Sequence, residues 1–113
     1  MLAICLRQWM RKMLQSVLMY KYTPDYTNEF RRNRRLIIKR GYDMAKLETT
    51  IDLLLQGGLM PPEYRDHPLK GNYKGYRECH VGGEGDWLLI YKKQEDKLIL
   101  VFTVTGTHAD LFE

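Results

Sequence analysis

The stretch Leu98-Ile99-Leu100-Val101-Phe102-Thr103-Val104 decides the fold of this 113-residue chain. It is rich in Val, Ile and Phe, residues that favour β-strands. Side chains of a strand alternate between the two faces of its sheet, and this stretch is apolar at both sets of positions. A strand that is apolar on both faces is typical of the interior of a sheet. We therefore expect a strand over residues 97–105 with a neighbour on each side.

Two more strands are expected before this one, joined by short turns. One covers residues 86–92 and is followed by the turn Lys93-Gln94-Glu95-Asp96. The other covers residues 73–81 and is followed by the turn Gly82-Gly83-Glu84-Gly85. Turns this short connect antiparallel strands. Because the glycine-rich turn joins strand to strand rather than strand to helix, it does not indicate a phosphate-binding loop.

Two helices are expected before these strands. The first would have Thr23 as its cap, with Pro24 at the first helical position, and would end at Gly41. The second would follow the cap Asp43 and end at Gly57-Gly58. The apolar residues of both recur at helical spacing, namely Tyr26, Phe30 and Ile37 in the first and Met44, Leu47, Ile51, Leu54 and Leu55 in the second. The short link between them predicts an antiparallel helical hairpin.

The remaining segments complete the expected topology. Residues 19–23 would form a short strand, and residues 59–72, which hold three of the four prolines, would form an irregular loop. The order β-α-α-β-β-β predicts an α+β fold, with the helical hairpin packed on a mainly antiparallel four-stranded sheet. Residues 19–113 would make up this single domain, because 113 residues suffice for one core.

The first 18 residues differ from the rest. Their apolar residues recur at helical spacing beside three basic residues and no acid. Their apolar run is too short to span a membrane, and the charges follow it, unlike the order in a secretory signal. One interpretation is an amphipathic helix that binds a membrane surface or a partner. We prefer a dispensable extension that results from a mis-set translation start, because Met19 and earlier methionines offer later starts.

Positive charge is concentrated in one run. The net charge is +4, of which residues 1–18 carry three, so 15 basic and 14 acidic residues remain. The residues between 31 and 40 include six basic side chains and no acid: Arg31, Arg32, Arg34, Arg35, Lys39 and Arg40. Such a run is most often a solvated helix face, but beside acid–base residues it also suits a polyanion such as RNA. We assign Arg31, Arg35 and Lys39 to substrate binding.

The two cysteines, Cys5 and Cys79, are too few for a disulfide framework. They indicate free thiols in a reducing cytoplasm. In the strand over residues 73–81, Cys79 and Val81 are expected on the buried face and His80 on the opposite, open face.

The only three histidines, His67, His80 and His108, lie in the second half of the chain. Histidine both gives and takes a proton near neutrality. Asp86 starts the strand next to that of His80, and His108 and Phe112 follow the interior strand. A groove at the open end of the sheet would therefore collect all five residues.

Two of the histidines also have a structural interpretation, whereas His108 has no obvious packing role. His67, which Pro68 holds extended, would only form hydrogen bonds within its loop. His80 would be half-buried and bonded to Glu78. Three histidines and an aspartate are also credible zinc ligands, but no pair has the spacing of a metal-binding motif. We therefore expect no metal and no other cofactor.

Four segments in the same order carry a family likeness: Asp66–Gly71 (DHPLKG), Tyr73–Val81 (YKGYRECHV), Asp86–Tyr91 (DWLLIY) and Thr105–Phe112 (TGTHADLF). Together they resemble the YafQ-type toxins, which belong to the RelE/ParE superfamily of type II toxin–antitoxin systems. The likeness runs from about Met19 to Phe112. The connection between Val81 and Asp86 is longer than is usual in that family, and residues 1–18 have no counterpart in it.

This resemblance implies a ribosome-dependent endoribonuclease that cuts mRNA and halts translation in the cytoplasm. The partners it implies are a cognate antitoxin, the ribosome and mRNA, and operator DNA only through the antitoxin, with no membrane partner. The functional residues it implies are His67, His80, Asp86, His108 and Phe112.

Cleavage of RNA without a metal uses the ribose 2′-OH as nucleophile and needs a base, an acid and a positive group at the phosphate. We assign His67 as base, His108 as acid and His80 to the phosphate, with Asp86 orienting a histidine and Phe112 stacking on a nucleotide.

Two rival functions remain. Toxins of the ParE branch act by binding DNA gyrase and need no acid–base residues, so the three histidines and Asp86 favour the nuclease. A degenerate relative that only binds an antitoxin is the other, and the intact set of residues argues against it.

Overall fold

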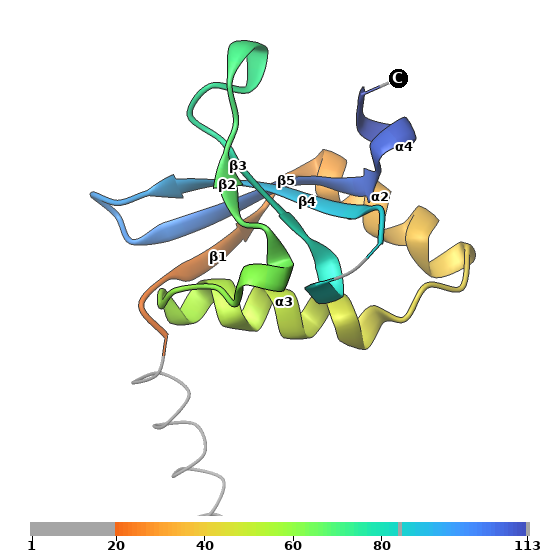
Figure 1. Ribbon diagram of the computed structural model, residues 1–113, viewed down its shortest axis with the longest axis horizontal. Coiled ribbons are helices and arrows are strands. Elements are labelled where there is room, and N and C mark those ends of the chain that lie inside the picture. Colours follow the sequence, from red (N-terminus) through yellow and green to blue (C-terminus); the bar gives the residue numbers. More distant parts are fainter. Residues whose placement is uncertain (1–19, 84, 113) are drawn as a thin grey trace, which may run out of the picture.

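The computed structural model describes residues 20–83 and 85–112. Its centre is a sheet of five strands in the order β1-β5-β4-β3-β2 (Figure 1). The strands are β1 (Thr23–Tyr26), β2 (His67–Pro68), β3 (Arg77–His80), β4 (Trp87–Gln94) and β5 (Ile99–Thr107). β1 runs parallel to β5, and the other neighbouring pairs are antiparallel. The prediction of an interior strand at residues 97–105 is confirmed, because β5 lies between β1 and β4.

The first strand and the first helix begin later than predicted. β1 starts at Thr23 and contains Pro24, and the cap of α2 (Asn28–Lys39) is Thr27, whose hydroxyl accepts a hydrogen bond from Phe30 N at 3.0 Å. Thr23 and Thr27 both donate their N–H groups toward β5, so the alternating position Pro24 faces the outer edge. Proline is tolerated in a strand at such an edge, since no ladder hydrogen bond is lost there. The predictions of a strand over 19–23 and of a cap at Thr23 were therefore wrong.

The second helix, α3 (Met44–Gln56), has the predicted ends. The Asp43 carboxylate accepts a hydrogen bond from Ala45 N at 3.1 Å, and Gly57 closes the helix with φ = 79°. A Cβ atom on Gly57 would also lie 2.8 Å from Cδ of Lys21, so both the backbone conformation and the space require glycine.

Both helices cover the same face of the sheet (Figure 1). Their buried residues form one core with alternate residues of β3, β4 and β5. The members that are at most 2% exposed include Phe30, Ile37 and Leu47 from the helices and Cys79, Leu89, Tyr91, Leu100 and Phe102 from the sheet. Cys79 and Val81 are buried, as predicted, and the thiol of Cys79 is free. Cys5 and the predicted extension 1–18 lie outside the described residues.

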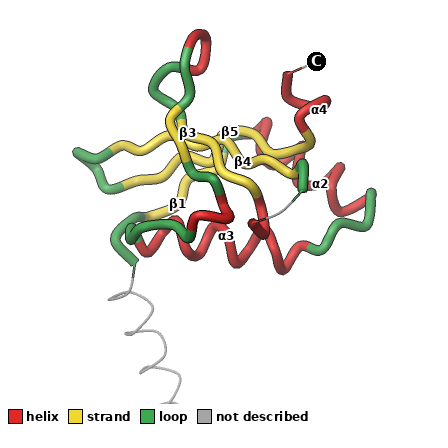
Figure 2. Tube along the Cα trace, viewed as in Figure 1, coloured by secondary structure: helices red, strands yellow, loops and turns green. Residues whose placement is uncertain are grey.

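The segment between α3 and β3 has more structure than the predicted irregular loop. Pro62–Tyr64 and Gly71–Tyr73 form 3₁₀ turns, and the two-residue strand β2 pairs with β3. The second of these turns lies in a projection between β2 and β3 (Figure 2), so β3 begins at Arg77 rather than Tyr73. β2 raises the number of strands from the predicted four to five, while the predicted α+β class is confirmed.

The chain after β5 forms the short helix α4 (His108–Phe112). α4 lies on the side of the sheet away from α3 (Figure 1). Within residues 20–83 and 85–112, no helix has both the length and the apolar character needed to cross a membrane.

Candidate active site

His67 and His80 share the face of the sheet that α2 and α3 leave uncovered. The β2–β3 register places His67 opposite Glu78, and His80 lies two residues after Glu78 on the same strand. Residues paired across strands, and alternate residues of one strand, point to the same face. His67 Nε2 lies 3.8 Å from the carboxylate of Glu78, whose side chain is 10% exposed against 48% for His67. The interpretation of Glu78 as a partner for His80 was wrong, since it pairs with His67.

Backbone carbonyl groups determine which ring nitrogen carries the hydrogen in His67 and His80. His67 Nδ1 lies 2.6 Å from the oxygen of Arg65, and His80 Nδ1 lies 3.0 Å from the oxygen of Gly85. A carbonyl oxygen only accepts hydrogen bonds, so each Nδ1 must carry the hydrogen. In the neutral rings, Nε2 is then the atom that accepts a proton. His67 therefore bonds within its own loop through Nδ1, as the structural interpretation held, while its Nε2 faces the carboxylate of Glu78.

Asp66 fixes the backbone next to His67. Its carboxylate accepts a hydrogen bond from Tyr91 Oη at 2.5 Å and an ion-paired hydrogen bond from Arg77 at 3.2 Å. Burial, together with the negative charge of Asp66, raises the pKa of Tyr91 well above its usual range. The Tyr91 hydroxyl thus remains a hydrogen-bond donor at neutral pH, and it holds the loop that carries His67 against the core.

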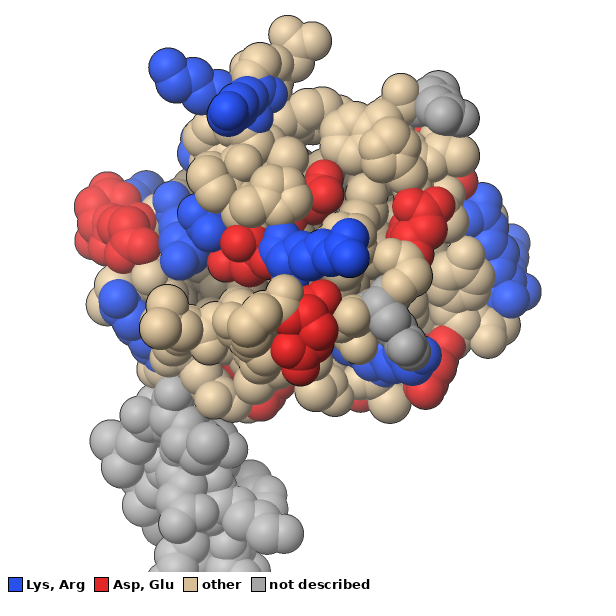
Figure 3. Space-filling model, viewed as in Figure 1, with Lys and Arg blue, Asp and Glu red and all other residues tan. Residues whose placement is uncertain are grey.

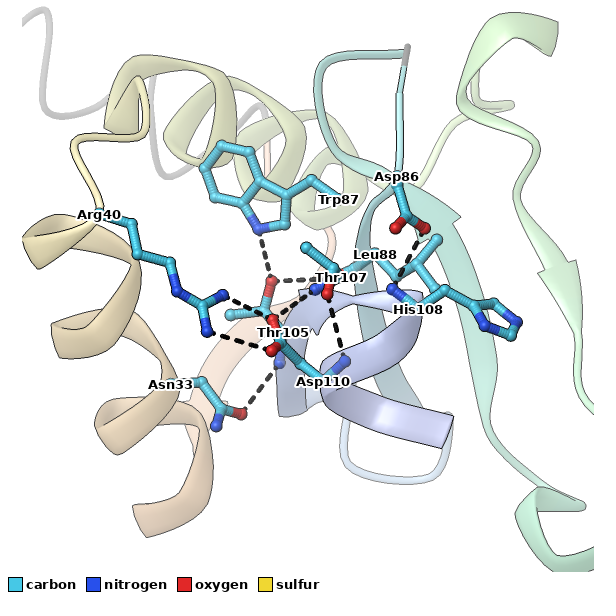
Figure 4. Close-up of polar contacts among 9 residues, drawn as sticks. All are labelled: Asn33, Arg40, Asp86, Trp87, Leu88, Thr105, Thr107, His108 and Asp110. Atoms are coloured by element: carbon cyan, nitrogen blue, oxygen red, sulfur yellow. Dashed lines mark hydrogen bonds and ion pairs between the residues drawn. The ribbon is translucent and has the colours of Figure 1, made fainter. Parts of the chain in front are cut away.

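Asp86 and His108 meet at the end of the β4–β5 pair. Trp87 lies opposite Thr107, which brings the residues just outside this pair together. The Asp86 carboxylate accepts a hydrogen bond from the backbone N–H of His108 at 3.1 Å. Asp86 therefore holds the main chain of His108 rather than its imidazole, and His108 is exposed. Figure 4 shows the ring of His108 pointing away from the polar contacts at this end of the sheet.

Phe112 belongs to an aromatic group that joins α4 to the β2–β3 projection. Its ring centroid lies 5.0 Å from that of His108 and 5.5 Å from that of Tyr73. Tyr73 in turn contacts Tyr76 with a centroid distance of 6.3 Å. At 37% exposure, Phe112 has a surface on which a nucleotide base could stack.

The strand register relates these groups to one another. His80 pairs with Leu88 on β4, and Leu88 pairs with Gly106 on β5. Asp86 and His108 lie two residues beyond this row, at the same end of the sheet. His67, which pairs with Glu78, lies one row from His80 in the opposite direction, away from Asp86 and His108. The structure thus places His67, His80, Asp86 and His108 on one face, with Asp86 and His108 at one end of the β4–β5 pair and His67 on the edge strand β2, toward the other end. Phe112 lies beside His108.

The three basic residues assigned to substrate binding lie elsewhere. Arg31, Arg35 and Lys39 are exposed and are spaced four residues apart on α2, which packs on the other face of the sheet. Figure 3 shows Lys and Arg side chains gathered over α2 and also on the β2–β3 projection. Two exposed lysines in that projection, Lys70 and Lys74, flank the turn that carries Tyr73.

Sequence reasoning missed the residues that support this site. Tyr73 stands in the family-like segment over residues 73–81, but only the fold brings it to Phe112. Asp66 directly precedes His67, while its partner Tyr91 is 25 residues away. Nothing in the local pattern signals such a contact.

The arrangement suits proton transfer on a substrate that lies at this face, where the imidazoles surround the buried Leu88 and Ile90. Three imidazoles and the carboxylates of Glu78 and Asp86 line one face. Across residues 20–83 and 85–112, no cluster of three or more His, Cys, Asp or Glu side chains has the arrangement needed to hold a metal ion.

Comparison with known proteins identifies the relatives of this chain. The sequence model of the family described as the bacterial toxin of type II toxin–antitoxin systems, YafQ, matches residues 22–113. The mRNA interferase toxin YafQ of Escherichia coli K12 is 48% identical over 89 residues, which cover 78% of this chain and 92% of that protein. The putative toxin YafQ of Haemophilus influenzae is 39% identical over 71 residues, 60% of this chain and 68% of that protein.

Solved structures agree with these relatives. The toxin in the crystal structure of the E. coli DinJ–YafQ toxin–antitoxin complex matches with a TM-score of 0.74 and 41% identity, covering 82% of this chain and 99% of that one. A metal-bound toxin from Helicobacter pylori matches with a TM-score of 0.74 and 32% identity, covering 80% of this chain and 99% of that one.

Proposed function

The chain belongs to the YafQ family of bacterial type II toxins, and on this premise we propose that it is an mRNA interferase, an endoribonuclease that cuts mRNA on the ribosome and arrests translation. The observation that supports this proposal is the position of His67, His80, Asp86 and His108 on the face of the sheet that α2 and α3 leave uncovered. A purely binding toxin has no use for such a set of titratable groups, so the gyrase-binding alternative is not favoured.

In the proposed reaction, the ribose 2′-OH attacks the adjacent phosphorus atom. A 2′,3′-cyclic phosphate forms, and the bond to the 5′ oxygen of the next nucleotide breaks. His67 Nε2 takes the proton of the 2′-OH, which is supported by the Nδ1 hydrogen bond to Arg65 O and by the nearby Glu78 carboxylate. The protonated imidazole that results is stabilised by that carboxylate.

The other groups complete the reaction. His108 gives a proton to the departing 5′ oxygen, and Asp86 holds the main chain from which His108 projects. His80, with its Nδ1 hydrogen directed to Gly85 O, places its other ring nitrogen toward the phosphate and steadies the developing negative charge. Phe112 stacks on a base next to the cut, which orients the RNA. No step requires a metal ion.

The proposed partners follow from the family and from the charge distribution. They are a cognate antitoxin, the ribosome with its mRNA, and operator DNA only through the antitoxin. The E. coli YafQ structure in a complex with DinJ supports the antitoxin. Arg31, Arg35 and Lys39 are proposed to contact ribosomal RNA from α2. The proposed setting is the cytoplasm, and residues 19–113 are proposed to suffice for activity.

The test is induced expression in a bacterial host, followed by primer extension on cellular mRNA. We expect growth arrest, new 5′ ends within coding regions and relief by co-expression of the antitoxin. A chain that starts at Met19 should behave in the same way. Normal growth with uncut transcripts would overturn the proposal, and growth arrest with uncut transcripts would redirect it to a non-nuclease target.

A second experiment tests the chemistry. In a reconstituted translation reaction, an mRNA with a single 2′-deoxynucleotide at the cut position should resist cleavage, because it lacks the nucleophile. The matched all-ribose mRNA should be cut and should carry a 2′,3′-cyclic phosphate. Toxin that has been treated with a chelator and desalted before addition should retain its rate. Cutting of the deoxy substrate would exclude the proposed nucleophile.

A further inference from the structure

The last helix is tied to the rest of the molecule by an ion pair that spans 70 residues of sequence. Arg40, at the end of α2, donates from Nη1 to Asp110 Oδ2 at 2.7 Å and from Nη2 to Asp110 Oδ1 at 3.1 Å. Such a fork of two parallel hydrogen bonds fixes both distance and orientation. Figure 4 shows the Arg40 side chain reaching from α2 across to Asp110 on α4.

Asp110 also closes the start of α4 from within. Its Oδ2 accepts the N–H of Thr107 at 2.9 Å, and its own N–H donates to the Thr107 hydroxyl at 3.2 Å. This reciprocal pair is the arrangement of a capping box, with Asp in the place usually taken by Glu or Gln. One carboxylate therefore serves both the helix start and Arg40.

Helix α4 has few contacts that hold it in place. It is five residues long and contributes no buried residue to the core. A helix this short has no stability of its own in water, because fixing the backbone of its first turn costs more free energy than the few hydrogen bonds contribute. Its position therefore depends on three contacts, which are the Arg40–Asp110 ion pair, the hydrogen bond from His108 N to Asp86 and the ring contact of Phe112 with Tyr73. These contacts decide where the rings of His108 and Phe112 lie.

The end of β5 is shaped to admit Asp110. A Cβ atom on Gly106 would lie 3.0 Å from Asp110 Cβ and 3.1 Å from its Oδ2. The hydrogen bonds from Arg40 and from Thr107 hold the pKa of Asp110 well below its usual range. The pair thus stays charged throughout the range in which histidines titrate.

We propose that Arg40 and Asp110 are positioning residues for RNA cleavage, which hold α4 so that the His108 imidazole and the Phe112 ring face the bound RNA. This inference rests on the proposed function. It also gives Arg40 a different role from the other basic residues between 31 and 40, although the sequence alone does not distinguish them. Arg31, Arg35 and Lys39 are directed to solvent, whereas Arg40 is committed to Asp110 within the protein.

The test compares Arg40→Gln with Asp110→Asn. These variants change the net charge in opposite directions, so a simple attraction to ribosomal RNA would shift their rates in opposite directions. If the ion pair instead positions α4, both variants cut mRNA more slowly. We expect each to reduce the rate of mRNA cutting at saturating ribosome by about tenfold, in the range caused by small misplacements of catalytic groups. The pH profile should keep its shape, because no titrating group of the reaction is removed.

Two further variants provide rescue and control. Asp110→Glu retains a carboxylate for both Arg40 and the capping box, so its cutting rate should stay within about threefold of the unmodified protein. Glu29→Gln breaks the exposed Glu29–Arg32 pair on the same helix, where the N···O distance is 3.8 Å, and should leave the rate unchanged. Wild-type cutting by Asp110→Asn, or opposite shifts of the two main variants, would overturn the proposal.

A readout without RNA keeps this test separate from that of the proposed function. Amide hydrogen exchange of Thr107 and Asp110, followed by NMR, should accelerate in both Arg40→Gln and Asp110→Asn but not in Glu29→Gln. Unchanged exchange would show that the ion pair does not hold α4. If the unmodified protein fails to cut mRNA while exchange accelerates as expected, the nuclease function is refuted and the anchoring of α4 stands.

Discussion

The two faces of strand β3 differ although their residues alternate in sequence. Cys79 is completely buried beneath the helices, and burial raises the pKa of its thiol far above the usual range, so it is a packing residue with no reactive thiolate. Its neighbours Glu78 and His80 point to the uncovered face, where they contact a second histidine and a backbone carbonyl. The face beneath the helices is packed with apolar side chains, whereas the other face presents polar groups around the buried Leu88 and Ile90.

The largest expected effect tests the covered face. Phe102→Ala removes a ring that is completely buried and contacts Phe30 and Tyr91, so it should lower the free energy of unfolding by about 3–5 kcal/mol. Val101→Ala on the same strand is the control, since Val101 is only partly buried, and about 1 kcal/mol or less is expected. Urea unfolding measures both. Equal losses would contradict the division of the sheet into two unlike faces.

The next effect tests the uncovered face. His108→Ala should lower the rate of mRNA cutting about a hundredfold or more, because the acid for the leaving oxygen is lost. Its stability should change by less than about 0.5 kcal/mol, since the side chain is exposed. Asp96→Ala, an exposed change in the turn at the other end of the β4–β5 hairpin, should alter neither quantity. Wild-type cutting by His108→Ala would remove His108 from the mechanism.

A third change tests the link between the two faces. Tyr91→Phe removes the hydroxyl that holds Asp66, at a cost of about 1.5–3 kcal/mol for a hydrogen bond to a charged group, and should also slow cutting through His67. Tyr22→Phe removes a comparable hydrogen bond to Glu95 far from the histidines and should leave cutting unchanged. If Tyr91→Phe is as stable and active as the parent, the Asp66 anchor has no role.

A smaller effect concerns the outer face of α2. Charge reversal of Arg31, Arg35 and Lys39 to Glu should weaken ribosome binding and reduce its dependence on salt, with the slope falling by about one for each phosphate that α2 no longer neutralises. Binding measured at two salt concentrations separates this from the cutting rate at saturating ribosome, which should persist. A salt dependence equal to that of the unmodified protein would show that α2 does not contact RNA.

The smallest effect is a pH dependence of stability. Because the pKa of Asp110 is lower in the folded protein than in the unfolded chain, its stabilising contribution is present above the ordinary aspartate pKa. That contribution is lost as the pH falls through the lowered pKa of the folded state. Asp110→Asn should therefore be slightly less stable than the parent at neutral pH, with the difference shrinking in strong acid. Thermal unfolding across this range measures it, and a constant difference would contradict the assignment.

Local patterns predicted much of the fold. The interior strand, the cap of α3 at Asp43 and its end at Gly57 follow from chemistry within a few residues, and all three are confirmed. β1 and β2 were misplaced or missed because each is short and gains its hydrogen bonds from strands distant in sequence. The cap at Thr27 has the same local chemistry as the predicted Thr23, and only the pairing of β1 with β5 distinguishes them.

The sequence alone determined which residue types were present for proton transfer, and that they stand in the order of a known toxin family. Tertiary structure alone decided their partners. Glu78 pairs with His67 rather than His80, Asp86 holds the backbone of His108, and Arg40 joins Asp110 instead of the basic surface. The physical reason is the distance along the sequence over which each interaction acts. Helix capping and strand alternation act over a few residues. These contacts depend on strand register and helix packing, which bring together groups up to 70 residues apart.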